Sequence, residues 1–465
     1  MEKYPVHLIG IGGSGLSAIG RVLIEKGYPV SGSDRQMTPF AQQLQSVGAT
    51  VYIGHRPENI KGASLVIRSS AIPEDNSEVQ AALKAGVTVL NRAEFISQLM
   101  DDQRGIAIAG THGKTTTTSM IAWLLQTNGL DPSFIIGGVP RNLGVNAHAG
   151  KGPYFVIEAD EYDRMFLGLK PEIAVITNIE YDHPDCFPTQ QDFYQAFRDF
   201  ALCLLPGGSL IVCSDDVGAV RLMDEVKSKY ATLPYGLNVL PNNQPPHFMG
   251  KNLKQGKNGA YSFEVMTDKE LPLRVELQVP GRHNVLNALA SLAVAELVGV
   301  LPKHAADALH EFLGTGRRFE VRGEVAGIKI IDDYAHHPSE IRATLSTARA
   351  TFPQRRLWAV WQPHTYSRIQ ALWDEFATAF WDADIVVMLD VYAAREQKPA
   401  QFVTRDLASQ INHPEVHFIE NIDQAVSYLQ KNLQHGDVLV VLSAGDADQI
   451  NTRLLVILGE QSEAG

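Results

Sequence analysis

The sequence has very little cysteine, which excludes a fold built on disulfide bridges. Its 465 residues include three cysteines, Cys186, Cys203 and Cys213, and none of them belongs to a CxxC pair. An odd number of scattered cysteines is typical of reduced, mostly buried thiols in a cytoplasmic protein, and it suggests no thiolate metal site. We therefore expect a cytoplasmic protein without disulfides.

The chain also lacks an excess of positive charge and a long apolar run. Its formal net charge is -12, whereas a protein that binds nucleic acid or an anionic membrane needs a basic surface. No apolar segment reaches the length of a membrane span, and a strand is expected almost at the N-terminus, without a signal peptide before it. These absences predict no nucleic-acid partner and no membrane insertion.

The most informative stretch runs from residue 104 to residue 118, where an apolar strand leads through a glycine turn into a helical pattern. Glycine lets backbone amides approach an oxyanion at a helix N-terminus, the lysine reaches the terminal phosphates, and the hydroxyl that follows can bind magnesium. Only two residues separate the glycines, so this P-loop is a shortened variant. The motif predicts an ATP site with Mg²⁺, formed by Gly110, Thr111, His112, Gly113, Lys114, Thr115 and Thr116.

A second glycine loop follows the first apolar strand of the chain. Gly10, Gly12 and Gly15 form a GxGxxG pattern, and Asp34 lies at about the distance expected of an acid that binds a ribose hydroxyl. The pattern predicts a diphosphate at a helix N-terminus and does not say which nucleotide carries it. The loop is also compatible with an NAD-dependent oxidoreductase, although that function gives Lys114 no role.

Polar residues follow two apolar strands in the middle third of the sequence. Glu158 closes the first strand, and His183 lies shortly after the second. Because the carboxyl ends of strands line the ligand crevice of an open α/β sheet, both residues should face Lys114. Glu158 and Thr115 are the expected oxygen ligands of magnesium, whereas His183 can bind a second magnesium, lie beside an attacking amine or cap local backbone.

The last third of the sequence repeats this arrangement. His336 and His337 follow a strand, and we expect one of them to act in the site while the other is oriented by Asp332 or Asp333. Guanidinium groups form bidentate pairs with phosphate or carboxylate. The candidates for such pairs are Arg317, Arg318 and Arg368, of which at least one should be structural.

The order of the expected elements predicts an α/β fold with three domains. A chain of 465 residues exceeds a single core, and strands alternate with helical patterns in each third. The expected elements include strands at 28–30, 173–176, 357–361 and 438–442, a hairpin or meander formed by 261–265 and 273–279, and a helix over 369–380. We expect three mainly parallel sheets with flanking helices: a Rossmann-like domain over 1–103, a P-loop ATPase-like domain over 104–315 and a second Rossmann-like domain over 316–465. The oligomeric state, monomer or homodimer, stays open.

Two phosphate-binding loops on separate domains suggest a reaction. An enzyme that holds a nucleotide-linked substrate in one loop and ATP in the other would use ATP to activate a group on that substrate, and a carboxylate is the usual target. A module that hydrolyses ATP without forming a bond is the alternative.

Several motifs, taken together, resemble the Mur ligases of peptidoglycan synthesis. They are Gly-Thr-His-Gly-Lys-Thr at 110–115, Glu-Ala-Asp-Glu at 158–161, Gly-Arg-His-Asn-Val-Leu-Asn at 281–287, Asp-Asp-Tyr at 332–334 and Gln-Pro-His at 362–364. The resemblance covers essentially the whole chain. It implies a cell-wall enzyme whose N-terminal domain binds UDP-N-acetylmuramate, whose central domain binds ATP with Mg²⁺, and whose C-terminal domain closes over the site.

The resemblance also implies a reaction. ATP would phosphorylate the lactyl carboxylate of UDP-N-acetylmuramate, and the amine of L-alanine would attack the acyl phosphate, which gives an amide, ADP and phosphate. The stretches at 136–140 and 158–163 are similar as well to family members that attach a recycled tripeptide to the same sugar nucleotide. L-Alanine is the expected acceptor, and the tripeptide is the alternative.

The roles that the resemblance implies for single residues fall into four groups. The catalytic residues are Lys114, His183, His336 and Arg368, and the metal ligands are Thr115, Glu158 and His183. Besides the glycine loop, the nucleotide would contact Asn284, Asn287, Arg317 and Asp332. The sugar nucleotide and the acceptor would contact Gly12, Gly13, Ser14, Gly15, Asp34, Ser69, Ser70, Arg92, Tyr334 and His364.

Overall fold

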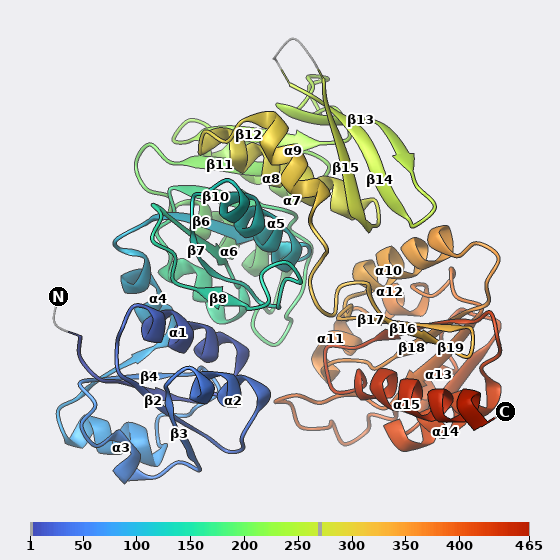
Figure 1. Ribbon diagram of the computed structural model, residues 1–465, viewed down its shortest axis with the longest axis horizontal. Coiled ribbons are helices and arrows are strands. Elements are labelled where there is room, and N and C mark those ends of the chain that lie inside the picture. Colours follow the sequence, from blue (N-terminus) through green and yellow to red (C-terminus); the bar gives the residue numbers. More distant parts are fainter. Residues whose placement is uncertain (1–2, 268–271, 465) are drawn as a thin grey trace.

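Three β-sheets organise the chain, one in each third of the sequence. The computed structural model describes residues 3–267 and 272–464. Figure 1 shows the N-terminal third (blue) and the C-terminal third (orange to red) side by side beneath the central third. Each sheet is parallel over most of its strands, so the predicted fold of three mainly parallel α/β units is confirmed. The domain boundaries at 103 and 315 stay predictions.

The first sheet has five parallel strands in the order β3-β2-β1-β4-β5. The second strand was predicted at 28–30 with a loop after it, and this prediction is wrong. The strand starts at Val30 because Pro29 has no amide hydrogen for the ladder, and it extends to Asp34 because Gly32 brings no side chain against the Leu8 carbonyl. The elements are β1 (Val6–Ile9), α1 (Ser14–Glu25), β2 (Val30–Asp34), α2 (Pro39–Ser46), β3 (Thr50–Ile53), η1 (Pro57–Ile60), β4 (Leu65–Arg68), α3 (Ser77–Lys84), β5 (Thr88–Asn91) and α4 (Arg92–Met100).

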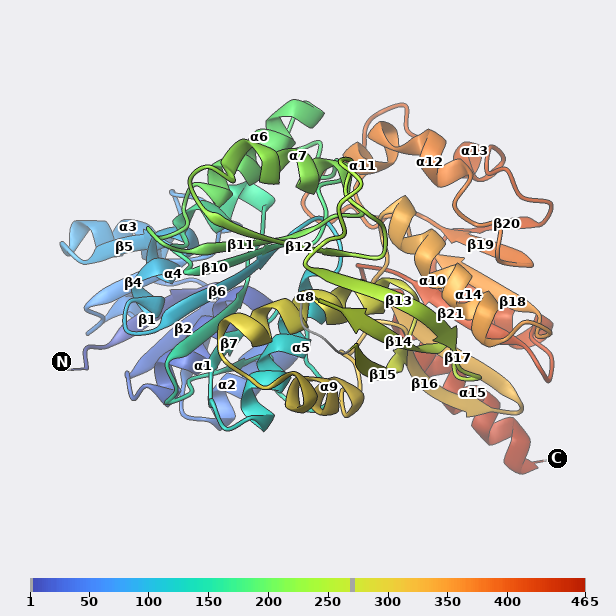
Figure 2. The same ribbon diagram turned by 90° about the horizontal axis from the view of Figure 1, so that it is seen from above.

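The central sheet has ten strands, and its inner strands are buried on both faces. Successive residues of β6 alternate between two cores: Ile106 and Ile108 face the helices α5 and α8, and Ala107 and Ala109 face α6 and α7. Figure 2 shows these two helical layers on opposite sides of the sheet. The strand order is β15-β14-β13-β12-β11-β10-β6-β9-β7-β8.

The central sheet is parallel from β7 to β13 and antiparallel at both ends. The predicted meander is confirmed and includes a third strand, β13. The elements are β6 (Arg104–Ala109), α5 (Lys114–Thr127), β7 (Ser133–Ile135), β8 (Ala147–His148), β9 (Tyr154–Glu158), η2 (Tyr162–Gly168), β10 (Ile173–Ile176), α6 (Gln190–Ala201), β11 (Ser209–Cys213), α7 (Val217–Val226), β12 (Ala231–Gly236), β13 (Phe248–Gln255), β14 (Ala260–Met266), β15 (Leu273–Pro280), α8 (His283–Leu297) and α9 (Pro302–His310).

The third sheet has the order β16-β17-β21-β18-β19-β20, and β16 alone of these strands is antiparallel to its neighbour. The helix predicted over 369–380 is wrong as a single element, because Leu372 leaves the helical region (φ −120°, ψ 23°) and separates α11 from α12. The elements are β16 (Glu320–Val325), β17 (Ile328–Asp333), α10 (Pro338–Thr351), β18 (Leu357–Trp361), α11 (Tyr366–Ala371), α12 (Trp373–Ala377), β19 (Ile385–Leu389), α13 (Thr404–Ala408), β20 (Val416–Ile419), α14 (Ile422–Asn432), β21 (Val438–Leu442) and α15 (Gln449–Ala464).

Two further expectations concern the thiols and the membrane. Cys186, Cys203 and Cys213 are free thiols, and only Cys213 is buried, so the expectation of mostly buried cysteines is wrong. Within residues 3–267 and 272–464, no helix is both long and apolar enough to cross a membrane.

Candidate active site

The glycine turn between β6 and α5 has a backbone that only glycine fits. Gly110 has φ +142° and Gly113 has φ +79°, values that other residues adopt at a cost. A Cβ atom on Gly110 would lie 1.9 Å from Thr177 Oγ1, and one on Gly113 would lie 2.7 Å from Asn287 Oδ1. The Thr111 and His112 amides are bonded to Asn178, so the amides placed to bind phosphate are those at the start of the 14-residue helix that follows.

Lys114 is held at this turn by carbonyls and a buried carboxylate. Its Nζ donates to the carbonyls of Gly110 and Thr111 and lies 2.9 Å from Glu161 Oε2. Burial disfavours the charge on Lys114, but the carboxylates of Glu161 and Glu158 outweigh it and raise the pKa of the ammonium. The cation is thus fixed and charged where the phosphates of a nucleotide would lie.

Glu161 was not among the predicted site residues, and it connects two of them. Its Oε1, which also accepts from Lys114 Nζ at 3.0 Å, lies 3.6 Å from His183 Nε2. Burial raises the pKa of Glu161, but Lys114 and His183 outweigh it and lower the pKa. The only sequence signal was the position of Glu161 in the acidic stretch after β9, where a solvated turn was an equal alternative.

The predicted metal ligands of the central domain meet at the ends of β9 and of the glycine turn. Thr115 Oγ1 donates to Glu158 Oε1 (2.9 Å), and the Gly137 amide donates to Glu158 Oε2 (2.7 Å). Burial raises the pKa of Glu158 although Lys114 lowers it. A hydroxyl and a buried carboxylate beside a phosphate-binding turn are oxygen ligands of the kind that Mg²⁺ takes, so the residues present fit that ion.

Arg368 joins the C-terminal domain to the central domain through a buried ion pair. Its Nε donates to Asp182 Oδ1 (2.7 Å) and its Nη2 to Asp182 Oδ2 (3.2 Å). Only 3% of the Arg368 side chain is exposed. Burial raises the pKa of Asp182, but Arg368 and His183 hold it well below its usual value. The guanidinium for which the resemblance implied a catalytic role is therefore already engaged by a carboxylate.

The two neighbouring histidines are oriented differently from the prediction. Neither Asp332 nor Asp333 bonds either imidazole in the described part of the chain. Asp333 accepts the Phe319 and Ala335 amides, and Asp332 pairs with Arg317 at 3.3 Å. Both carboxylates are buried, which raises their pKa values to about 6, and neither bonds an imidazole of the described residues, so the predicted orientation by either aspartate is wrong.

His336 is oriented by backbone and His337 by its own helix. His336 Nδ1 donates to the Tyr334 carbonyl (2.9 Å), and burial lowers the pKa of its imidazole to about 4 although Glu340 opposes the shift. His337 is the N-cap of α10, and its Nδ1 accepts the Ser339 amide. His336 lines the large cavity described below, so of the two it is the histidine placed to meet a substrate.

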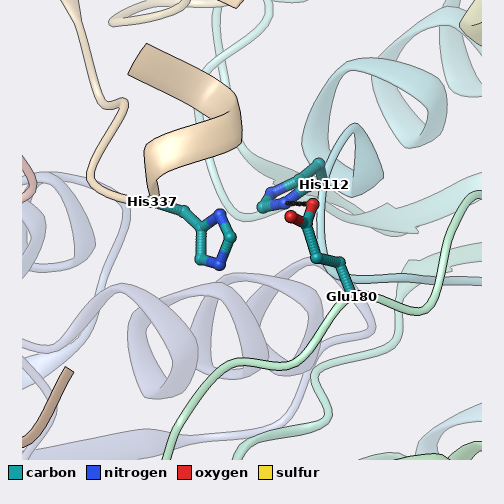
Figure 3. Close-up of side chains that lie close together, drawn as sticks. All are labelled: His112, Glu180 and His337. Atoms are coloured by element: carbon teal, nitrogen blue, oxygen red, sulfur yellow. Dashed lines mark hydrogen bonds and ion pairs between the residues drawn. The ribbon is translucent and has the colours of Figure 1, made fainter. Parts of the chain in front are cut away.

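Figure 3 shows His112, Glu180 and His337, a group that could hold a metal ion. His112 Nε2 lies 2.9 Å from Glu180 Oε2, and its Nδ1 lies 3.2 Å from Glu340 Oε1. Burial disfavours the charge, but these two carboxylates raise the pKa of His112 to about 9. The charged imidazole thus forms ion pairs that link the glycine turn to α10 of the C-terminal domain.

Two connected cavities lie around these residues. The larger, of about 740 Å³, is lined by residues of all three domains, and the smaller, of about 250 Å³, lies against α8. Gly113, Thr115, Arg318 and Glu340 line both cavities. The larger contains Ser14, Lys114, Glu158, His183, Arg317, Tyr334, His336, His364 and Arg368, and the smaller contains His112, Thr116, Asn284 and Asn287.

Asp332 lines neither of these cavities, since its side chain is fully buried behind Arg317. Arg317 adopts φ +58° and donates through Nη2 to the Ser443 carbonyl at 2.6 Å. His364 stacks on Tyr392 with ring centroids 5.7 Å apart. The roles implied for these residues stay predictions, and Asp332 is the one that the geometry places away from the cavities.

Two side chains of the N-terminal domain, Asp34 and Arg92, contact the N-terminal glycine loop. The Gly12 amide donates to Asp34 Oδ2 (2.9 Å), and Arg92 lies so close to Gly15 that a Cβ there would stand 2.4 Å from its Nη1. Burial lowers the pKa of Arg92, and the carboxylates of Asp160 and Glu158 oppose this from the central domain. Ser69 and Ser70 follow β4 at the same edge of the sheet, and Gly13 and Ser14 are exposed there.

The fold and this site define a class of enzyme: a three-domain P-loop ligase in which one cavity receives residues from every domain. Family models for Mur ligases match the chain in three segments. They are described as the Mur ligase family catalytic domain (residues 5–104), the Mur ligase middle domain (108–295) and the Mur ligase glutamate ligase domain (317–445).

The chain belongs to the Mur ligase family. It is 41% identical to the UDP-N-acetylmuramate–L-alanine ligase of Roseiflexus sp. (strain RS-1), over 98% of this chain and 99% of that protein. It is 38% identical to the ligase of that name from Caldanaerobacter subterraneus, over 98% of each. A crystal structure of UDP-N-acetylmuramate-alanine ligase from Thermotoga maritima has a TM-score of 0.82 and 27% identity, with 99% of both chains covered. A murein peptide ligase from Psychrobacter arcticus has a TM-score of 0.73 at the same identity, over 98% of this chain and 99% of that one.

Proposed function

We propose that this chain joins L-alanine to the lactyl carboxylate of UDP-N-acetylmuramate at the expense of ATP. The observation that carries the proposal is the cavity of about 740 Å³, where Lys114 of the phosphate loop, Ser14 of the N-terminal loop and His336 of the C-terminal domain line the same space. A reaction between a nucleotide, a sugar-linked acid and an amine needs three binding elements around one volume. The relatives that bear this activity in their names align over nearly the whole chain.

In this proposal the smaller cavity takes the nucleoside of ATP. Asn284 and Asn287 line it beside Gly113, and the Asn287 side chain accepts from Thr117 and donates to Asn284. The phosphates would then run along the glycine turn to Lys114. The Lys114 ammonium, kept charged by Glu161, steadies the phosphoryl group while it moves to the substrate carboxylate.

The residues that fit Mg²⁺ are Thr115 and Glu158 for one ion, with His183 for a second. When bound, Mg²⁺ would supply charge neutralisation of the phosphate oxygens. The His183 backbone is in the left-handed region (φ +54°), and its imidazole accepts from Arg368 through Nδ1. This bond leaves Nε2 directed at Glu161, so the ring is held in one orientation beside the reaction cavity.

The acyl phosphate then meets the amine in the same cavity. Formation of the amide releases phosphate and requires the amine to lose its proton. His336 is neutral near pH 7 because burial lowers its pKa to about 4. With Nδ1 donating to a carbonyl, its Nε2 is free of a proton and can accept one, which is the part that we assign to it.

A product assay tests the proposal. The purified chain is incubated with UDP-N-acetylmuramate, ATP and Mg²⁺ plus either L-alanine or the murein tripeptide, and the nucleotide products are separated and weighed by mass spectrometry. The proposal predicts UDP-N-acetylmuramoyl-L-alanine and ADP in the first reaction. If product forms only with the tripeptide, the acceptor is the peptide and not L-alanine. If ADP forms at the same rate with either acceptor and no amide is made, the protein is an ATPase.

Three finer statements belong to the same proposal. ATP and Mg²⁺ are its cosubstrate and metal, the cytoplasm is its compartment, and the enzyme acts as a monomer or homodimer. The NAD reading of the N-terminal loop predicts tight NADH binding that is unaffected by the sugar nucleotide. Titration with NADH in the presence and absence of UDP-N-acetylmuramate separates the two.

A further inference from the structure

We propose that Arg395 binds the α-carboxylate of the amino-acid acceptor, an inference that rests on the proposed function and adds a subsite to it. An amino acid carries a carboxylate that takes no part in the reaction, so the cavity needs a cation to recognise it. Five cationic side chains line the large cavity: Lys114, Arg317, Arg318, Arg368 and Arg395.

Four of these five cations are already committed. Lys114 has three oxygen partners, and the Arg368 guanidinium is buried against Asp182 and His364. Arg317 holds Asp332 and the Ser443 carbonyl. Arg318 lines both cavities, next to the phosphate loop, and is the cation placed for the nucleotide phosphates.

Arg395 differs from these four in exposure and in its bonds. Its side chain is 49% exposed. In the described part of the chain, it donates one hydrogen bond, from Nη2 to Asp185 Oδ2 at 2.6 Å. A guanidinium has five N–H donors in a planar fork, so one edge of Arg395 can receive a carboxylate through two parallel bonds.

The guanidinium is also held in place before any acceptor arrives. Its central carbon lies 3.9 Å from the centroid of the Tyr162 ring, and the Tyr162 hydroxyl donates to the same Asp185 oxygen at 3.1 Å. The ring supports one face of the guanidinium and leaves its edges open, so little conformational freedom is lost on binding.

Arg395 is also in the right part of the cavity. Tyr162 packs edge-on against His183 with ring centroids 5.1 Å apart, and Arg368 bonds the other side of that imidazole. An acceptor carboxylate on Arg395 would thus lie next to the His183 segment, between the central and C-terminal domains. The amine, two bonds from the carboxylate carbon, would then be directed into the cavity that contains Lys114 and His336.

The test compares L-alanine with L-alaninamide, which has no carboxylate. Steady-state kinetics are measured for the wild type, Arg395→Gln and Arg395→Lys at saturating ATP and UDP-N-acetylmuramate. For Arg395→Gln we expect kcat/KM for L-alanine to fall on the order of 10–100-fold, mainly through KM, as for the loss of a charge-assisted pair. For L-alaninamide the change should stay within about threefold, and Arg395→Lys, which keeps the charge without the fork, should fall between.

The matched control is Arg453→Gln, which removes another half-exposed arginine of an ion pair, on α15, and should leave both acceptors unchanged. An equal loss for L-alanine and L-alaninamide, or a parallel rise in KM for ATP and the sugar nucleotide, would overturn the subsite, since Arg395 would then act only on domain closure. So would a kcat/KM for L-alanine within about twofold of the wild type. A wild-type protein that makes no amide from L-alanine would overturn the proposed function itself.

Discussion

The two glycine loops of this chain share a sequence pattern but differ in their side chains and in the backbone just before the helix, where Gly13 is extended (φ −77°) and Gly113 is left-handed (φ +79°). They align position by position: Gly10 with Gly110, Gly13 with Gly113, and the first helical residues Ser14 and Gly15 with Lys114 and Thr115. Each loop joins the end of a buried strand to the start of a helix, so each can present amides to an anion. The ligand is decided by what the neighbouring strands contribute.

The side chains that face the two loops differ in charge and in burial. The central loop faces two carboxylates, the half-buried Glu158, which accepts from Thr115, and the buried Glu161, which holds Lys114. The N-terminal loop faces Asp34, which accepts a hydrogen bond from the Gly12 amide, and Arg92, whose guanidinium lies beside Gly15. In the proposed function, a cleaved triphosphate and a retained diphosphate are bound by two loops of the same glycine pattern.

The largest expected effect is that of Lys114→Ala on turnover. Removal of a fixed cation that stabilises transferring charge should lower kcat roughly 100–1,000-fold, while the affinity for UDP-N-acetylmuramate, measured by calorimetry, stays unchanged. Lys170→Ala, at an exposed position, is the control and should behave as the wild type. Loss of sugar-nucleotide binding in Lys114→Ala would contradict the separation of the two loops.

Arg92→Ala should give the reverse pattern. Without a guanidinium beside Gly15, KM for the sugar nucleotide should rise roughly 10–100-fold, and the dissociation constant of ATP should change little. Arg56→Ala, in the same domain and exposed, provides the control. If Arg92→Ala weakened the binding of ATP as much as that of the sugar nucleotide, the two loops would form a single site.

Alanine substitutions at the two aligned glycines, Gly113 and Gly13, should lower the free energy of unfolding by different amounts. Gly113 has φ +79° and a close neighbour in Asn287, whereas a Cβ on Gly13 would meet only the Gly10 carbonyl at 3.5 Å. Gly113→Ala should therefore lower the free energy of unfolding by about 1–2 kcal/mol, the cost of a side chain in the left-handed region. Gly13→Ala should be within about 0.5 kcal/mol of the wild type. Denaturant titrations measure both, and equal losses would contradict the assigned backbone strain.

The smallest expected effect concerns pH, because only the central loop carries a titrating residue between its glycines. The pKa of His112 is about 9 in the folded chain, above the usual 6.5 of a histidine. The stability that its charge provides is therefore complete below about pH 6.5 and is lost as the pH rises through about 9. The melting temperature of His112→Gln should lie about 2–4 °C below that of the wild type at pH 6, with the gap closing by pH 9.5. A gap that widens with pH would contradict a charged His112.

Much of this fold could be predicted because the inner strands are continuous apolar runs. Ile173–Ile176, Leu357–Trp361 and Val438–Leu442 have the bounds that their sequences predict. Two strands that were not predicted, Thr50–Ile53 and Glu320–Val325, lie at sheet edges, where most of their side chains are exposed or half-buried and leave no clear alternation.

The site was harder to predict where contacts cross between domains. Lys114, Thr115 and Glu158 were predictable because strand, turn and helix place them locally. The pairing of Arg368 with Asp182, 186 residues apart, has no local signal, and nothing in the sequence says that a buried carboxylate would already occupy that guanidinium. Glu161 was missed because its role follows from its burial between Lys114 and His183, and Arg395 because its partner Asp185 lies on another domain.

The most direct test of the account is an isotope measurement on the proposed acyl phosphate. UDP-N-acetylmuramate labelled with ¹⁸O in the lactyl carboxylate is converted with ATP, Mg²⁺ and L-alanine, and the released phosphate is analysed by mass spectrometry. An acyl phosphate intermediate predicts one ¹⁸O in the phosphate for each amide formed, because a carboxylate oxygen leaves with the phosphoryl group. Amide formation with unlabelled phosphate would contradict it.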